Sequence, residues 1–83
     1  MAIDYRRLRH LRARELIAAL NRDGFSFHHS NGSHQRYLHP DGRRVTVAPH
    51  GGGDTFTVKT LKRIIEDQAR WTDEDLRRLG VLK

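Results

Sequence analysis

The sequence contains no cysteine, and its 83 residues include only two prolines, one methionine and one tryptophan. The lack of cysteine excludes disulfide bonds and thiolate metal sites. No apolar run approaches the roughly 20 residues of a membrane-spanning helix, and no apolar signal-peptide core follows the first arginines. We therefore expect a small cytoplasmic protein without a membrane segment, whose core is limited to two layers.

Positive charge is in excess, with a formal net charge of +6, and 13 of the 16 basic residues are arginine. The arginine fork matches phosphate oxygens bidentately, so this excess favours a nucleic-acid backbone as partner. The distribution is uneven: arginines crowd the first 14 residues, whereas acidic residues are concentrated after residue 65. Such polarity also suits a protein partner of mixed charge, so composition alone leaves both classes open.

Apolar residues recur with helical spacing in residues 4–21, where Asp4 is a candidate N-cap. The polar part of this stretch, up to Arg12, is either a loose extension of the helix or a separate short one. Gly24 ends the element, because glycine tolerates the left-handed conformation at a helix C-terminus.

A second helix is predicted over residues 57–69, with Thr57 as its N-cap. Its inner apolar stripe consists of Val58, Leu61, Ile64 and Ile65. Thr72 then begins a short helical turn that Gly80 closes, and we expect Trp71 to anchor this turn against the domain.

Three stretches between the helices, residues 25–29, 33–39 and 43–48, alternate polar and apolar residues as strands do. Two-residue turns at Asn31-Gly32 and Asp41-Gly42 would place Arg36 on the apolar face of the sheet. Three-residue turns, Ser30-Asn31-Gly32 and Pro40-Asp41-Gly42, would place Tyr37 there instead and leave Leu38 exposed.

Burying an arginine without an acidic partner costs several kcal/mol, whereas exposing a leucine costs far less. We therefore predict the register with three-residue turns. The core face then carries Phe25, Phe27, Tyr37, Val45 and Val47. The open face carries Ser26, His28, His34, Arg36, Arg44 and Thr46.

The predicted fold class is α+β: an α-β-β-β-α sandwich in which two helices cover one face of a three-stranded antiparallel sheet. A short C-terminal helical turn is added to it. We expect one domain over residues 1–83, with its core at about 13–69, a basic N-terminal extension at 1–12 and an acidic C-terminal tail at 70–83.

The order of several short motifs resembles the HicA (YcfA-like) family. The motifs are Asp23-Gly24-Phe25, Gly32-Ser33-His34, Tyr37, His39-Pro40-Asp41-Gly42-Arg43, Val45-Thr46-Val47 and His50. The resemblance implies a toxin of a type II toxin–antitoxin module with a fold like that of double-stranded-RNA-binding domains. It further implies cleavage of mRNA and neutralisation by a HicB antitoxin. The family's functional histidine, which follows Gly-Ser, falls on His34.

The residues around His34 fit such chemistry, because a histidine can accept or donate a proton near neutral pH. Arg36 and Arg44 would stabilise the negative charge of the phosphoryl transition state. Gly32 allows RNA to approach the backbone, and Ser33 offers a hydroxyl to a phosphate. His28, predicted across from His34, is either a second proton carrier and RNA contact or an ordinary polar strand residue.

Other interpretations of the histidines remain. Without the resemblance, His34 is better interpreted as an ordinary exposed sheet histidine, one of six. His29 and His39 are expected near strand ends, where they cover the core margin or cap turns, and His50 either binds RNA or ends the third strand. A zinc set of His28 and His34, with His50 as a further candidate, is disfavoured because no carboxylate or thiolate completes it, so we expect no metal and no small-molecule cofactor.

The sequence thus predicts a metal-independent endoribonuclease with His34 as its catalytic residue. One alternative is a non-catalytic RNA-binding module of the same fold. The other is a protein-interaction module that regulates a HicB-like partner.

Overall fold

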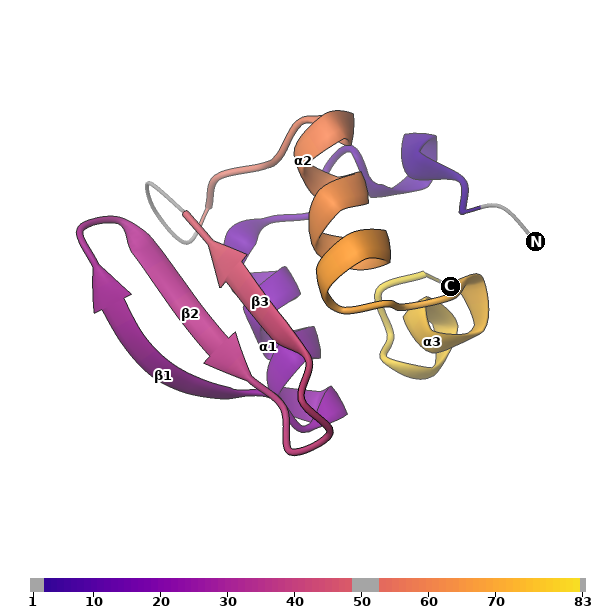
Figure 1. The fold of residues 1–83 in the computed structure, drawn as a ribbon. Helices are drawn as coiled ribbons and strands as arrows, with labels where there is room; N and C mark the ends of the chain where they lie inside the picture. The colour runs from indigo at the N-terminus through magenta and orange to yellow at the C-terminus, as the bar shows by residue number, and fades with distance from the viewer. Residues whose placement is uncertain (1–2, 49–52, 83) are drawn as a thin grey trace.

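The computed structural model of the chain describes residues 3–48 and 53–82. Its fold is α+β, as predicted, with an antiparallel sheet in the order β1-β2-β3 (Figure 1). Along the chain the elements are η1 (Tyr5–Leu8), α1 (Ala13–Asp23), β1 (Ser26–Asn31), β2 (His34–Leu38), β3 (Arg44–Val47), α2 (Val58–Lys62), η2 (Arg63–Gln68) and α3 (Asp73–Arg78).

The predicted N-terminal helix consists of two separate pieces. Asp4 caps the short 3-10 helix η1, where its side chain accepts a hydrogen bond from the Arg6 amide at 3.1 Å. The α-helix α1 begins only after Arg12, whose backbone N–H donates to the Glu15 carboxylate at 2.9 Å. The break between the two pieces is fixed from outside, because the Ala13 amide donates to the Asp54 carbonyl at 2.7 Å.

Gly24 ends α1 with a φ of 105°. A side chain here would also collide with His39, since a Cβ on Gly24 would lie 2.9 Å from the His39 Nε2 atom. That nitrogen is held 2.8 Å from the Asp23 carbonyl oxygen. His39 therefore joins the end of β2 to the end of α1, at the core margin as expected.

Of the two predicted turns, one is confirmed and one is wrong. Pro40-Asp41-Gly42 is a three-residue turn: the His39 amide donates to the Arg43 carbonyl at 3.0 Å, and Gly42 has a φ of 98°. The β1–β2 turn consists instead of Gly32-Ser33, because Asn31 pairs with His34. Only the first of these two central residues has a positive φ, 64° at Gly32, as a type II′ hairpin turn requires.

The second helix begins as predicted, with the Thr57 hydroxyl accepting from the Thr60 amide at 3.2 Å. It continues as the π-helix η2, which ends with the Ala69 amide bonded to the Ile64 carbonyl at 2.8 Å. Leu61, Ile64 and Ile65 are buried, but Val58 is 49% exposed, so its assignment to the inner stripe was wrong. Val58 is the first residue of the helix, one turn before its buried part.

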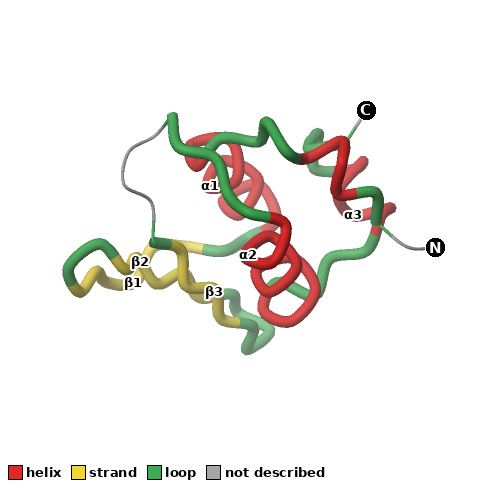
Figure 2. The backbone as a smooth tube through the Cα atoms, turned by 90° about the horizontal axis from the view of Figure 1, so that it is seen from above, coloured by secondary structure: helices red, strands yellow, loops and turns green. Residues whose placement is uncertain are grey.

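The helices lie on one side of the sheet, and the β1–β2 hairpin projects beyond them (Figure 2). Apolar residues of α1, β2, β3, α2, η2 and α3 form one core cluster. Trp71 belongs to it, and its indole N–H donates to the Asp23 carboxylate at 2.9 Å, so it anchors α3 as predicted. Thr72 caps α3, and Gly80 follows with a φ of 79°.

Tyr37 is buried and pairs with both Phe27 and Val45, which confirms its predicted face. Phe25 is buried as well, although it precedes β1. Phe27, predicted to lie in the core, is 55% exposed. It has the core-facing parity, but it lies on the edge strand of the projecting hairpin, where its ring packs edge-on against Tyr37.

Candidate nucleic-acid interface

The sheet face opposite the helices is polar and cationic. Cross-strand pairing aligns His29, Arg36 and Thr46 in one row across the three strands, and paired residues share a face of the sheet. A second row consists of Ser26, Leu38 and Arg44. We call this surface the open face. Arg36 and Arg44 are exposed, as predicted, whereas Leu38 is partly buried.

His34 is the first residue of β2 and is exposed, as predicted. The Gly32-Ser33 turn places it directly after the reversal of the chain, opposite Asn31. Among the described residues, no heavy atom outside Gly32 and its two chain neighbours lies within 4 Å of the position that a Cβ on Gly32 would occupy. The backbone before His34 is therefore open to a close approach by a ligand.

His28 does not lie across from His34, contrary to the prediction. A β-bulge interrupts the pairing between Phe27 and His29 and leaves His28 without a cross-strand partner. The bulge brings His29 into the row of Arg36, although His29 was predicted to cover the core margin or to cap a turn. The Nδ1 atoms of His28 and His29 lie 2.7 Å apart, so the two rings form one exposed pair.

A cleft of about 480 Å³ lies beside His34, between the sheet and the second helix. From the sheet, Thr46 and Ala48 line it together with His34. The opposite wall comes from α2, η2 and the segment before them: Thr55, Phe56, Thr57, Thr60, Arg63, Ile64 and Gln68. The outer edge of β3 is tied to this wall, because the Thr46 amide donates to Gln68 Oε1 at 2.8 Å.

Sequence reasoning did not find the cleft residues Thr60, Arg63 and Gln68. Their positions on a helix give no signal of proximity to His34, since only the packing of that helix along the β3 edge brings them together. Arg63 had one available sign: it lies between the apolar positions of the helix, on its exposed side.

The arginines differ sharply in their partners. Arg43 contacts the Asp23 carboxylate at 3.1 Å, the Asp41 carboxylate at 2.7 Å and the Ala69 carbonyl at 2.6 Å. Within residues 3–48 and 53–82, the side chains of Arg36, Arg44 and Arg63 have no hydrogen-bond or ion-pair partner. Arg43 is therefore structural, whereas the other three guanidinium groups are available to a ligand.

Asp23, the last residue of α1, contacts Arg43, Trp71 and Arg78 on the helix side of the sheet, and its side chain is 8% exposed. Burial raises the pKa of this carboxyl. Hydrogen bonds from Trp71 and Arg78 and the charge of Arg43 lower the pKa by more than burial raises it, so the net pKa lies below its ordinary value. The ionised carboxylate thus joins the end of α1 to the β2–β3 turn and to α3.

Metal binding finds little support in the described part of the chain, where no group of three or more His, Cys, Asp or Glu side chains is placed to hold an ion. The zinc set considered for His28 and His34 is not assembled, because the register separates them. His50, the remaining candidate, lies outside the described residues.

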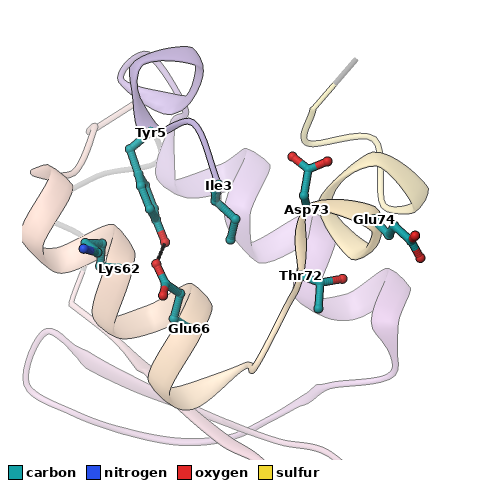
Figure 3. Close-up of a pocket in the computed structure, with 7 residues that line it drawn as sticks. All are labelled: Ile3, Tyr5, Lys62, Glu66, Thr72, Asp73 and Glu74. Atoms are coloured by element: carbon teal, nitrogen blue, oxygen red, sulfur yellow. Dashed lines mark hydrogen bonds between the residues drawn. The ribbon is translucent and has the colours of Figure 1, made fainter. Parts of the chain in front are cut away.

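A second cleft, of about 590 Å³, lies on another side of the same helix and is acidic (Figure 3). Glu66, Asp73 and Glu74 line it, with Lys62 as its only basic lining residue among those described. The Tyr5 hydroxyl donates to the Glu66 carboxylate. Burial, followed by this hydrogen bond and the Glu66 charge, raises the pKa of Tyr5. This cleft does not suit a nucleic-acid phosphate, because its carboxylates would repel the negative charge of the phosphate.

One family model matches residues 13–70, and it describes the HicA toxin of bacterial toxin–antitoxin systems. The match covers α1, the whole sheet and the second helix, including His34 and both walls of the cleft beside it. The protein is therefore a toxin of the toxin–antitoxin class. More specifically, the chain belongs to the HicA toxin family.

A search of curated proteins gives no match to the chain. Across the residues that the structure describes, no helix has the length and apolar character needed to cross a bilayer.

Proposed function

We propose that this toxin is a metal-independent endoribonuclease that cleaves mRNA, with His34 as its catalytic residue. The observation that carries the proposal is the position of His34. It is exposed directly after an open Gly-Ser turn, at the junction of a cationic sheet face and a cleft without carboxylates among its described lining residues. Membership of the HicA family supports the toxin role on which the proposal builds.

The proposed reaction uses the RNA itself as nucleophile. The 2′-hydroxyl loses its proton to a base, its oxygen bonds to the adjacent phosphorus, and the bond from phosphorus to the 5′-oxygen breaks. The leaving 5′-oxygen takes up a proton, so the products are a 2′,3′-cyclic phosphate and a 5′-hydroxyl. His34 serves as the base or as the acid in this sequence, and water completes the other transfer.

Arg36 and Arg44 are proposed to bind the RNA backbone on the open face, where their guanidinium groups are exposed. Gly32 and Ser33 are proposed to contact the RNA backbone next to His34. His28 contributes through its pair with His29 rather than from across the sheet, because the bulge removes it from the register of His34.

The antitoxin partner is proposed to be HicB-like and to cover His34 and the open face. A protein with a formal net charge of +6 attracts a partner that presents acidic groups, and such association is fast and weakens with salt. Covering the proposed catalytic histidine is the most direct way to silence the toxin.

The decisive experiment compares His34→Gln with His10→Gln, an equally conservative change at an exposed histidine outside the interface. His34→Gln should abolish RNA cleavage in vitro and growth arrest on expression, because glutamine cannot carry the proton. His10→Gln should retain both. Cleavage by the parent protein should also persist in EDTA.

Stability should change by less than about 0.5 kcal/mol in both variants, since both positions are exposed. Full toxicity of His34→Gln would show that His34 only positions RNA and would favour a non-catalytic RNA-binding module. Cleavage that stops in EDTA and returns with magnesium would contradict the metal-independent reaction.

A further inference from the structure

We propose that the cleft beside His34 binds the nucleotide whose phosphate is cleaved, and that Arg63 is the residue that binds this phosphate. The proposal rests on the proposed role of His34 and adds the location of the substrate. It also distinguishes two sets of cations. Arg36 and Arg44 on the open face bind flanking backbone, whereas Arg63 binds the reacting phosphodiester.

The size and composition of the cleft suit one nucleotide. Its volume of about 480 Å³ lies within the range of small-molecule sites. A partly buried aromatic residue, Phe56, lines it beside Ile64 and gives a base an apolar surface. His34 lines the same cleft, so a phosphodiester bound there lies next to the proposed proton carrier.

Two polar side chains of the cleft keep a donor for a ligand. The Thr57 hydroxyl donates to the Thr60 hydroxyl at 3.0 Å, which leaves the Thr60 hydrogen available to a ligand. The Gln68 side-chain oxygen is occupied by the Thr46 amide, so its NH₂ group remains as a donor. A site that offers hydrogens selects a ligand rich in acceptors, and phosphate oxygens are the strongest acceptors in RNA.

Arg63 supplies the positive charge. Its side chain has no ion-pair or hydrogen-bond partner in the described part of the chain, and none of the described residues lining this cleft is acidic. The neighbouring acidic cleft makes the contrast, since Lys62 lines it together with Glu66 and two further carboxylates (Figure 3). Adjacent residues of one helix thus serve clefts of opposite charge, and only the cleft of Arg63 suits an anion.

Binding is tested with a fluorescein-labelled single-stranded RNA, titrated by fluorescence anisotropy into protein carrying His34→Gln, so that cleavage does not interfere. Adding Arg63→Gln should weaken binding about tenfold, as expected for the loss of a hydrogen-bonded charge on phosphate. The slope of log K against log salt should fall by about one. Arg63→Lys should retain part of the affinity, because it keeps the charge and loses the fork.

Lys59→Gln is the matched control, because Lys59 is an exposed cation one turn earlier on the same helix and does not line the cleft. It should change affinity by less than about twofold, as expected where no direct phosphate contact is removed. Amide NMR signals of Thr57, Thr60 and Arg63 should shift when the RNA is added, which locates the ligand without relying on a substitution. A circular dichroism melt checks that each variant is folded.

Equal affinity of the Arg63→Gln and Lys59→Gln proteins, or shifts confined to the open face, would overturn the cleft as the binding site, as would a lack of RNA binding by the parent protein. The nuclease proposal fails separately. If the unsubstituted protein binds RNA through Arg63 but never cuts it, the cleft stands and catalysis by His34 falls.

Discussion

The backbone of Arg70 has a strained, left-handed conformation at the end of the second helix. Its φ of 58° is the only positive φ of a non-glycine residue within the described ranges. The Trp71 amide bonds to the Ile65 carbonyl at 2.8 Å across this residue, so Arg70 occupies the left-handed position where helices usually end with glycine. The conformation turns the chain toward α3 and brings Trp71 into the core.

Arg70→Gly should therefore raise the free energy of unfolding by about 0.5–1 kcal/mol. Removing the Cβ relieves about 1–2 kcal/mol of strain, and part of this gain is offset by the larger entropy of glycine in the unfolded chain. Urea denaturation measures the change. Arg70→Ala is the control, because it removes the same charge but keeps a Cβ at positive φ. Equal stabilisation by alanine would show that charge rather than strain is relieved.

β1 is an edge strand whose six residues are all exposed. The two phenylalanines near its start differ in burial: Phe25, just before the strand, is buried under Arg43 and edge-on to Trp71, whereas Phe27 is 55% exposed. The strand is therefore held mainly by backbone pairing to β2 and by the ring contact of Phe27 with Tyr37, at 5.8 Å between centroids. No strand among the described residues pairs with its outer side, which is therefore accessible to a partner or to RNA.

Substitutions at the two phenylalanines should separate these roles. Phe25→Ala should cost about 3–5 kcal/mol, because it leaves a cavity in the core. Phe27→Thr keeps a good strand former and should cost less than about 1.5 kcal/mol, mostly the lost aromatic pair. Chemical denaturation of both variants measures the difference. If both variants lost a comparable free energy of unfolding, Phe27 would be buried in solution rather than exposed.

The ion-pair network of Asp23 connects parts of the chain that are remote in sequence. Arg43 reaches Asp23 from the β2–β3 turn, with its side chain 18% exposed, and Arg78 reaches it from α3 at 2.9 Å. Trp71 donates to the same carboxylate. A lowered carboxyl pKa in the folded state means that this network stabilises the protein while Asp23 is ionised.

Asp23→Asn should reduce the free energy of unfolding at neutral pH by about 1.5–3 kcal/mol, since it removes the charge from the hydrogen bonds of Asp23 while Arg43 and Arg78 each keep a second carboxylate, Asp41 and Asp75. The stabilising effect of the native carboxylate is complete above its unfolded pKa of about 3.9 and is lost as the pH falls through the lower folded pKa. The difference in stability between parent and variant should therefore shrink below about pH 4.

Thermal or urea unfolding across this pH range measures the effect. Glu74→Gln, at an exposed carboxylate of α3, serves as the control and should change stability by less than about 0.5 kcal/mol. A difference that stays constant from neutral to acidic pH would contradict the assigned charge state of Asp23.

Local patterns in the sequence were enough to predict most of the elements. Caps at Thr57 and Thr72, the Pro40-Asp41-Gly42 turn and the alternation of Val45 and Val47 act within a few residues, so their outcome hardly depends on the rest of the fold. The three-residue Pro40-Asp41-Gly42 turn also sets which residues of β2 face the core. The sequence therefore predicted the burial of Tyr37 and the exposure of His34 and Arg36.

The tertiary structure alone decided the register of β1 and the wall of the cleft. The predicted three-residue turn would pair Phe27 with Gln35 and His29 with Ser33. In the structure Phe27 pairs with Tyr37, two residues further along β2, and keeps its face. The bulge shifts the partner of His29 by three residues, to Arg36, and so turns His29 to the open face. Sequence patterns do not report a bulge, because it alters parity without altering composition. Arg63 came beside His34 for a different reason. The helix packs along the β3 edge through buried Leu61 and Ile64, and that packing depends on the complete core rather than on any local signal.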